Sequence, residues 1–184
     1  MNLDRIPEDI RLRIREAVIN AAEEKRPLRL LFVCLGNICR SPAAQGIFES
    51  MAKTEDLKNV EADSCGFYGG HAGDLPDSRM RHAAIQRGYS LTHRSRQIRP
   101  YDFEDFDLIF GMDDQNLSDL HDTARSPEEE RRIIPMAVLA TDHPQVDAVP
   151  DPYWDGAEGF YNVLNILEDA CANLIALIKE YRKF

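Results

Sequence analysis

The chain has 184 residues, of which 43% are hydrophobic and 29% charged, and its net charge is −10 at pH 7. Length and composition predict one soluble domain. We expect no membrane insertion, because no apolar run is long enough to cross a bilayer. We expect the protein in the cytoplasm, because the N-terminus does not resemble a signal peptide. The acidic charge argues against a nucleic-acid partner, which needs a basic face, whereas a small anion needs only one local positive pocket.

The first predicted element is an amphipathic helix within residues 1–27. Its apolar residues recur at helical spacing among charges of both signs: Ile6, Ile10, Ile14, Ala17, Val18 and Ala21. We expect an N-terminal helical extension over residues 1–27 and the main domain over residues 28–184. The apolar stripe either packs on that domain or contacts a partner or a second copy of the chain. Binding to a membrane surface is disfavoured because the charges are mixed rather than basic.

From residue 28 onward, strands and helices alternate. The predicted order is strand 28–34, helix 42–52, strand 60–64, helix 78–86, strand 107–112, helix 113–121, strand 133–139 and helix 157–182. The first strand is a continuous apolar run, which is typical of a strand buried on both faces. The alternation predicts an α/β fold with a parallel sheet covered by helices on both sides. Ligands of such sheets bind beyond the carboxyl ends of the strands. Cys34 is the last residue of the first strand and is therefore expected at this end of the sheet.

Residues 34–40, Cys-Leu-Gly-Asn-Ile-Cys-Arg, join this strand to a helix. Such a loop can curl so that its N–H groups point inward and form an anion nest before the positive end of the helix dipole. Gly36 and Asn37 tolerate the left-handed backbone that the curl needs. The nest and Arg40 would favour the thiolate of Cys34, and the planar fork of Arg40 suits two phosphoryl oxygens. We therefore expect a nucleophile beneath a phosphate cradle, rather than a small buried residue that ends a strand.

The other cysteines do not indicate a metal centre. Cys39, Cys65 and Cys171 form neither a Cys-x-x-Cys pair nor a cluster with histidine. Four cysteines in a chain of this length do not indicate a disulfide scaffold in the cytoplasm. We expect no metal and no cofactor.

The segment "VCLGNICRSPAAQGIF" resembles the signature of the low-molecular-weight protein tyrosine phosphatases. Three later segments are similar to further family motifs, in the same order: "LTHRSRQI" at 91–98, "FGMDDQNLSDL" at 110–120 and "VPDPYW" at 149–154. The resemblance covers residues 28–184 and leaves the N-terminal extension outside. It implies a three-layer sandwich with a four-stranded parallel sheet, of the flavodoxin-like, phosphotyrosine phosphatase I type. The implied activity is metal-independent hydrolysis of phosphotyrosine in protein substrates.

The resemblance also implies residue roles. Cys34 would attack phosphorus and form a cysteinyl-phosphate, Arg40 would bind the phosphate, and Asp151 would protonate the leaving oxygen and then activate water. A tyrosine leaving group has a pKa near 10, so a positioned proton contributes roughly 10²–10⁴ in rate. The phosphate-binding loop would also include Leu35, Gly36, Asn37, Ile38, Cys39 and Ser41.

Supporting roles follow from the same resemblance. Ser41 would hydrogen-bond the thiolate, and Asn37 and His93 would hold the strained backbone of the loop. Asp113 matches an acidic residue beside the site, although the start of a helix also explains an acid there. The family is known for a protective disulfide after oxidation, which implies a reversible Cys34–Cys39 bond. Alternatively, Cys39 only fills space at the base of the loop.

The sequence departs from the family pattern at the substrate wall. Many bacterial members have tryptophan directly before a histidine, and here Gly70 precedes His71. Phe67 and Tyr68 lie upstream, and each either covers the pocket or packs on the domain. Tyr153 and Trp154, next to Asp151, are the other candidates for the wall.

Three alternative functions remain. Protein arginine phosphatases resemble this family but commonly have threonine where Ile38 stands. Arsenate reductases of the same scaffold relay a disulfide through two later cysteines, and residues 113–127 contain none. A phosphate-binding module without turnover is the third alternative, against which the complete set of Cys34, Arg40 and Asp151 argues.

Overall fold

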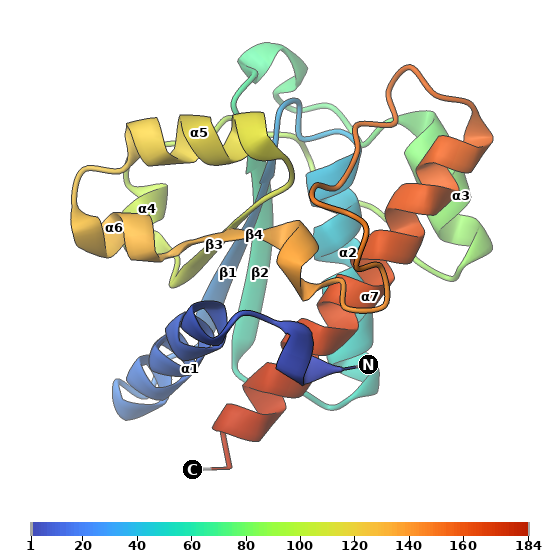
Figure 1. Ribbon diagram of the computed structural model, residues 1–184. Helices are drawn as coiled ribbons and strands as arrows, with labels where there is room; N and C mark the ends of the chain where they lie inside the picture. The colour runs from blue at the N-terminus through green and yellow to red at the C-terminus, as the bar shows by residue number, and fades with distance from the viewer. Residues whose placement is uncertain (1, 184) are drawn as a thin grey trace.

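A computed structural model describes residues 2–183 and contains one four-stranded sheet with strand order β2-β1-β3-β4 (Figure 1). The strands are β1 (Leu28–Cys34), β2 (Val60–Gly66), β3 (Leu108–Gly111) and β4 (Ile133–Pro135). All neighbouring strands pair in parallel. The α/β class and the four-stranded parallel sheet expected from the sequence are confirmed.

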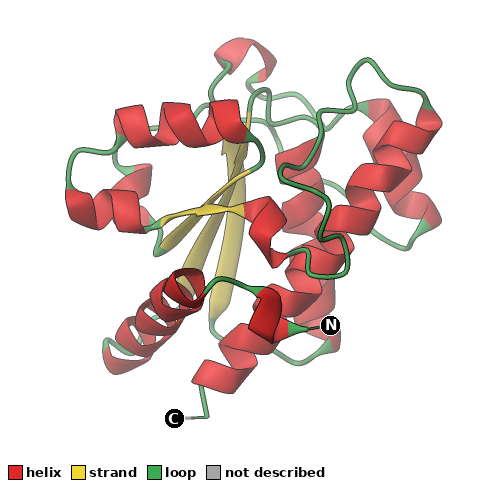
Figure 2. Cartoon of the chain, viewed as in Figure 1, coloured by secondary structure: helices red, strands yellow, loops and turns green. Residues whose placement is uncertain are grey.

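Helices cover both faces of the sheet, so the fold has three layers (Figure 2). One layer contains α1 (Glu8–Glu23), α2 (Arg40–Thr54), α3 (Ser78–Gln86) and α7 (Ala157–Tyr181). The other contains α4 (Asp102–Asp105), α5 (Asp114–Thr123) and α6 (Pro127–Arg131). Short 3-10 turns lie at Leu3–Arg5, Gly69–His71 and Met136–Leu139.

The central strand β1 supplies side chains to both hydrophobic layers. Leu30 and Phe32 belong to the larger core cluster beside α2 and α7, whereas Leu31 and Val33 belong to the smaller cluster beside α5. Successive residues of a strand point to opposite faces, so a strand between two helical layers must be apolar throughout. Phe32 stacks on Phe110 of β3 with ring centroids 5.4 Å apart. The apolar run of β1 is therefore continuous because both faces of the strand are covered by helices.

The extra N-terminal helix packs on the domain. Ile10, Ile14, Val18 and Ala21 of α1 are buried in the larger core cluster, together with residues of α7. Arg13 Nη1 donates a hydrogen bond to the carbonyl oxygen of Ile133, which ties α1 to the start of β4. Because the apolar stripe is buried within the chain, it is not free to contact a partner.

Several element boundaries differ from the sequence-based prediction. The fourth strand ends at Pro135 and continues as a 3-10 turn, so its predicted extension to residue 139 was wrong. Proline has no N–H group to donate to a sheet ladder, which accounts for the end of the strand. The short helices α4 and α6 were missed. For α6 the signal was present, since Ser126 caps its N-terminus and Pro127 occupies its first turn.

The longest helix, α7, lies in the core. Within the described residues it is the one helix long and apolar enough to span a membrane on length and composition, which is weak evidence for a span. Its apolar face is buried in the larger core cluster, as expected for the core helix of a globular fold.

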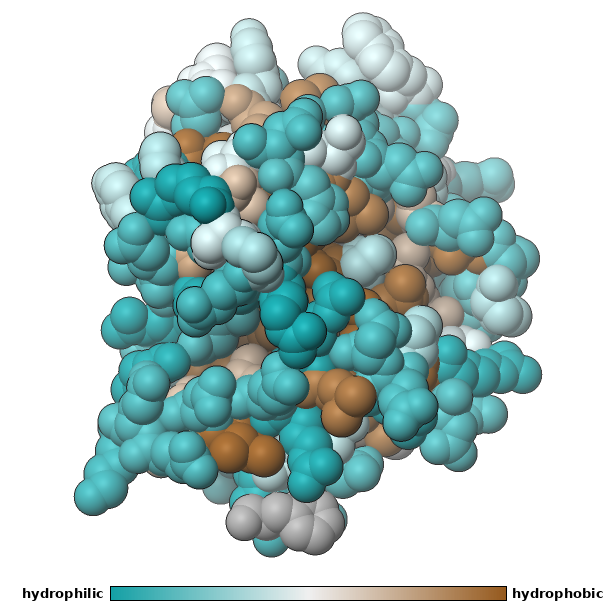
Figure 3. All heavy atoms as spheres, turned by 60° about the vertical axis from the view of Figure 1, so that its left-hand side comes forward, coloured by the Kyte–Doolittle hydropathy of each residue, from teal (hydrophilic) through white to brown (hydrophobic). Residues whose placement is uncertain are grey.

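The face of the molecule in Figure 3 is mostly hydrophilic, with hydrophobic residues in smaller patches.

Candidate active site

The phosphate loop, residues 34–41, connects the carboxyl end of β1 to the start of α2. Cys39 is the N-cap residue of α2, and Arg40 begins the helix two residues earlier than predicted. Behind the loop, Gly66 ends β2, and a Cβ atom there would lie 2.6 Å from the carbonyl oxygen of Leu35. A glycine is therefore needed at Gly66 for the loop to pass this closely.

Asn37 holds the shape of the phosphate loop. Its φ is 53°, in the left-handed region, and its side chain is buried. Its Nδ2 donates to Ser41 Oγ at 2.8 Å and to Ser64 Oγ at 3.0 Å. Its Oδ1 accepts from His93 Nε2 at 3.1 Å and from the backbone N–H of Arg96 at 3.0 Å. The strained backbone is therefore secured by four hydrogen bonds from the side chain.

The His93 ring lies between Asn37 and Asp63, with Nε2 3.1 Å from Asn37 Oδ1 and Nδ1 3.5 Å from Asp63 Oδ1. Burial, the largest cause, lowers the pKa of His93, although the nearby Asp63 carboxylate opposes this effect. A ring with a proton on Nε2 donates to the amide oxygen of Asn37. The structure thus brings together the pair that the sequence resemblance singled out.

Cys34 lies at the base of the site. The residue is 3% exposed, and its Sγ lies 3.0 Å from Ser41 Oγ. Ser41 also accepts from Asn37 and lies 3.3 Å from the carbonyl oxygen of Cys65. A hydroxyl in this position can donate a hydrogen bond to a thiolate and stabilise it.

Arg40 is buried and faces two carboxylates. Its Nη1 donates to Asp113 Oδ2 at 2.6 Å and to the carbonyl oxygen of Val149 at 3.1 Å, and its Nη2 lies 3.5 Å from Asp151 Oδ2. Burial lowers the pKa of Arg40, but the charges of Cys34 and Asp113 outweigh it and hold the pKa above its ordinary value. Asp113 also caps α5 by accepting from Asn116 N at 2.8 Å, so this acid both contacts Arg40 and caps a helix.

The expected nucleophile, arginine and acid meet around one cavity of about 240 Å³. Its lining residues are Cys34, Leu35, Gly36, Ile38, Cys39, Arg40, Tyr68, His71, Asp151, Tyr153 and Trp154. They come from the phosphate loop, the loop after β2 and the loop before α7. The carboxyl ends of parallel strands place such distant loops together.

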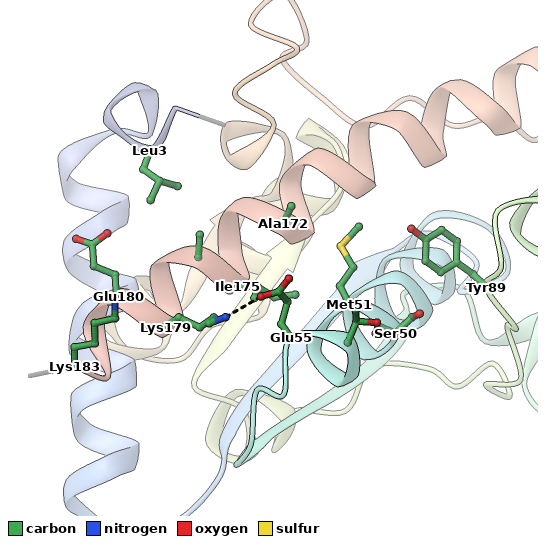
Figure 4. A pocket seen from close by; sticks show the side chains of 12 residues that line it. Leu3, Ser50, Met51, Glu55, Tyr89, Ala172, Ile175, Lys179, Glu180 and Lys183 are labelled. Atoms are coloured by element: carbon green, nitrogen blue, oxygen red, sulfur yellow. Dashed lines mark hydrogen bonds and ion pairs between the residues drawn. The ribbon is translucent and has the colours of Figure 1, made fainter.

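A larger cavity, of about 690 Å³, lies elsewhere, between α2, α7 and the N-terminal turn (Figure 4). Met51 and Ile175 line it, as do Lys179 and Glu55, which form an ion pair of 2.8 Å. Its described lining residues include neither cysteine nor arginine, so it lacks the cysteine–arginine pair. Size alone therefore does not identify the reactive site.

Of the two aromatic candidates after β2, Tyr68 lines the cavity and Phe67 does not. Phe67 packs against the smaller core cluster with Cys65, because residues two apart near a strand point to the same face. The expectation that Phe67 could form the wall is corrected accordingly. A Cβ atom at Gly70 would lie 2.2 Å from the Tyr68 ring, so the glycine leaves the space that this ring occupies.

The other aromatic residues flank Asp151. Tyr153 and Trp154 form an edge-to-face pair with ring centroids 4.9 Å apart. Trp154 is 91% exposed, whereas Tyr153 is partly covered. His71, which also lines the cavity, meets the Tyr68 ring edge-on at 5.5 Å. The sequence analysis named His71 only to locate Gly70 and did not predict that His71 lines the cavity. Its position next to two glycines, in the loop expected to form the substrate wall, could have indicated this.

Two further features complete the site. Burial, followed by the charges of Asp77 and Cys34, raises the pKa of the Cys39 thiol, which therefore stays protonated. Ser95 Oγ donates to the carbonyl oxygen of Asn37 at 2.6 Å, a contact that sequence reasoning missed. Within residues 2–183, no group of three or more histidine, cysteine, aspartate or glutamate side chains is arranged to hold a metal ion.

Comparisons with known proteins identify the family of the chain. The sequence profile described as low molecular weight phosphotyrosine protein phosphatase matches residues 29–183. A putative low molecular weight protein-tyrosine-phosphatase of Synechocystis is 42% identical over 150 residues, which is 80% of this chain and 94% of the relative. A low molecular weight phosphotyrosine protein phosphatase of Drosophila melanogaster is 37% identical, covering 83% of this chain and 96% of the relative.

Solved structures show the same fold. A protein tyrosine phosphatase from Entamoeba histolytica superposes with a TM-score of 0.80 at 41% identity, covering 84% of this chain and 99% of that chain. A Drosophila arginine phosphatase superposes with a TM-score of 0.76 at 30% identity, covering 81% of this chain and 96% of that chain.

Proposed function

Since the chain belongs to the low molecular weight phosphotyrosine protein phosphatase family, we propose that it hydrolyses phosphotyrosine in protein substrates through a cysteinyl-phosphate on Cys34, without a metal ion. The observation that carries this proposal is the meeting of Cys34, Arg40 and Asp151 around one cavity at the carboxyl end of β1. We place the reaction in the cytoplasm, where a reactive thiol is kept reduced.

In the first step, the Cys34 thiolate attacks phosphorus and the bond from phosphorus to the tyrosine oxygen breaks. Asp151 gives its proton to the departing oxygen, so that neutral tyrosine leaves. Asp113 and Val149 hold one arm of Arg40, and the phosphoryl oxygens would bind its Nε and its Nη2, which also lies 3.5 Å from Asp151. These contacts stabilise the charge that develops on the equatorial oxygens.

In the second step, water attacks the phosphorus of the cysteinyl-phosphate and the sulfur–phosphorus bond breaks. Asp151, now ionised, takes a proton from the water. The sulfur leaves as a thiolate, which Ser41 Oγ stabilises from 3.0 Å. Inorganic phosphate is released, and the enzyme returns to its starting state.

The substrate wall favours an aromatic phosphoester. Tyr68 and Tyr153 both line the cavity, and so does Ile38. Aromatic rings prefer offset or edge-to-face packing, which a bound phenyl ring can adopt between two tyrosines. The wall residues of this proposal are therefore Tyr68, Tyr153 and Trp154.

A related arginine phosphatase is the second candidate, because one similar structure is a Drosophila arginine phosphatase. The apolar, branched Ile38 at the cavity suits an aryl ring better than a guanidinium. Arsenate reduction has no comparable support. That reaction would relay a disulfide through two later cysteines, and the two that follow the phosphate loop, Cys65 and Cys171, are both buried.

One assay tests the proposal. We expect hydrolysis of a phosphotyrosine peptide in the presence of a metal chelator, and little release of phosphate from a matched phosphoarginine peptide. Cys34→Ser serves as the inactive control, because a serine hydroxyl is a poor nucleophile without a nearby base. Preference for phosphoarginine would support the second candidate, and the absence of turnover on both would indicate a phosphate-binding module.

A further inference from the structure

We propose that Arg79 is a positioning residue that holds the acid loop, residues 150–156, against the phosphate loop. This inference rests on the proposed function, in which Asp151 of the acid loop transfers the proton. Arg79 belongs to the first turn of α3 and does not line the reactive cavity. Its contacts connect the two loops in three steps.

The first step is a two-pronged ion pair with Asp77. Arg79 Nε donates to Asp77 Oδ1 at 3.0 Å and Nη2 donates to Oδ2 at 2.9 Å. The same carboxylate caps α3 by accepting from the backbone N–H of Arg79 at 2.8 Å. Two parallel hydrogen bonds fix the plane of a guanidinium as well as its position.

The second step links Asp77 to the phosphate loop. The backbone N–H of Asp77 donates to the carbonyl oxygen of Ile38 at 2.7 Å. Ile38 lines the cavity one residue before Cys39. The guanidinium of Arg79 is thus connected through Asp77 to the loop that contains Ile38.

The third step reaches the acid loop. Arg79 Nη1 donates to the carbonyl oxygen of Tyr153 at 2.9 Å, and the guanidinium lies 5.2 Å from the centre of the Tyr153 ring. It also lies 4.8 Å from the ring of Phe160, which is buried at the start of α7. In turn, the backbone N–H of Tyr153 donates to Asp151 Oδ1 at 3.1 Å. Arg79 therefore fixes the residue whose N–H orients the general acid.

Besides Arg79, the acid loop is supported by Arg40, whose Nη2 lies 3.5 Å from Asp151 Oδ2, and by the burial of Pro152. Within the described part of the chain, no other side chain donates a hydrogen bond to residues 152–156 from outside the loop. The loop is anchored before Asp151 by Val149, which donates to the carbonyl oxygen of Met112 at 2.8 Å, and after it by α7. Without Arg79, the middle of the loop would move relative to Cys34, and a displacement of about 1 Å can cost roughly 100-fold in rate.

The test compares Arg79→Gln and Arg79→Lys with a matched control, Arg87→Gln. Arg87 is also on the α3 side, pairs with Glu168 at 2.8 Å and stacks on Tyr161 at 5.6 Å, but it does not contact the acid loop. Lysine keeps the charge at position 79 and loses the fork that makes three contacts at once. The measurement is kcat/KM for aryl phosphates whose leaving groups differ in basicity, together with inhibition by inorganic phosphate.

We expect Arg79→Gln to lower kcat/KM by about 10-fold to 100-fold for phenyl phosphate, and far less for dinitrophenyl phosphate, which leaves without a proton. Arg79→Lys should recover only part of this loss. Inhibition by inorganic phosphate should stay within about twofold, because Arg40 and the phosphate loop are intact, and Arg87→Gln should match the parent. An equal loss for all leaving groups, or weakened phosphate inhibition, would show a merely structural role and overturn the inference.

A second readout does not depend on activity. Trp154 is the one tryptophan of the chain, and its ring packs edge-on against Tyr153. Arg79→Gln should lower the fluorescence anisotropy of Trp154, whereas Arg87→Gln should leave it unchanged. If the parent hydrolyses aryl phosphates but Arg79→Gln changes neither anisotropy nor leaving-group dependence, the inference is wrong and the proposed function stands. If the parent hydrolyses none, the proposed function is wrong, and the anisotropy alone decides whether Arg79 holds the loop.

Discussion

Asn37 has a strained backbone, and its side chain makes four hydrogen bonds. Its φ of 53° is in a region that costs most residues about 1–2 kcal/mol, and asparagine visits it more readily than alanine does. The side chain also joins Ser41, Ser64 and His93 beneath the loop. Asn37 therefore contributes in two ways to the phosphate loop: its backbone adopts the left-handed turn, and its side chain hydrogen-bonds the residues beneath the loop.

Two substitutions separate these contributions. Asn37→Gly keeps the backbone accessible and removes the side chain, whereas Asn37→Ala removes both advantages. We expect Asn37→Ala to be less stable than Asn37→Gly by about 1 kcal/mol in chemical denaturation, and both variants to lose most of their phosphatase activity. Equal stability of the two variants would show that the backbone strain is negligible.

The substrate wall makes a second prediction at this scale. Tyr68→Leu should weaken binding of phosphotyrosine by about threefold to tenfold, since one aromatic contact contributes about 0.5–1.5 kcal/mol. Phe67→Leu is the matched control, because Phe67 packs against the smaller core cluster and should affect stability instead. The measurement compares inhibition by free phosphotyrosine with inhibition by inorganic phosphate. Tyr68 has no part in the wall if Tyr68→Leu binds phosphotyrosine as the parent does.

Cys39 carries the third prediction, which concerns oxidation. We expect peroxide to inactivate the enzyme reversibly through a Cys34–Cys39 disulfide, in which Cys34 is oxidised to a sulfenic acid and the Cys39 sulfur then displaces water. Burial raises the pKa of the Cys39 thiol, so Cys39 itself is a poor target for peroxide. Cys39→Ser should remain active but fail to recover with a dithiol after peroxide. Recovery equal to the parent, or a disulfide to Cys65 or Cys171, would exclude this role.

At the scale of elements, the sequence predicted what is local and missed what depends on neighbours. The bounds of β1 agree with prediction because its apolar run is continuous, and α3 agrees because Gly88, with φ of 85°, ends it. Strand β2 was predicted to end at residue 64, but it pairs with β1 as far as Gly66. That extension decides which face Phe67 occupies, so the choice between Phe67 and Tyr68 could not be made from the sequence.

The N-terminal helix makes the fourth prediction. Ile14→Ala should lower the free energy of unfolding by about 2–5 kcal/mol, because Ile14 is fully buried in the larger core cluster. Leu12→Ala on the same helix is the control, since Leu12 is 46% exposed and should change stability by only about 0.5 kcal/mol. Chemical denaturation of both variants provides the comparison. Equal effects would mean that α1 is not part of the core in solution.

At the scale of the whole molecule, the site is assembled from segments far apart in the chain. Cys34 and Arg40 were predictable because they share one short loop, and Asp151 because its Asp-Pro motif is similar to the family's. The contact of Arg79 with Tyr153, 74 residues away, has no local pattern that could reveal it. Parallel strand order brings such loops to one edge of the sheet, so the fold has to be known before these contacts can be found.

The central claim is that Cys34 carries the phosphoryl group between substrate and water. The most direct measurement is rapid acid quenching of the enzyme during turnover of an aryl phosphate with a metal chelator present, followed by peptide mapping by mass spectrometry. We predict a phosphoryl group on Cys34 in the parent and none in Cys34→Ser, which also shows no turnover. A phosphoryl group on another residue, or turnover that persists in Cys34→Ser, would contradict the account.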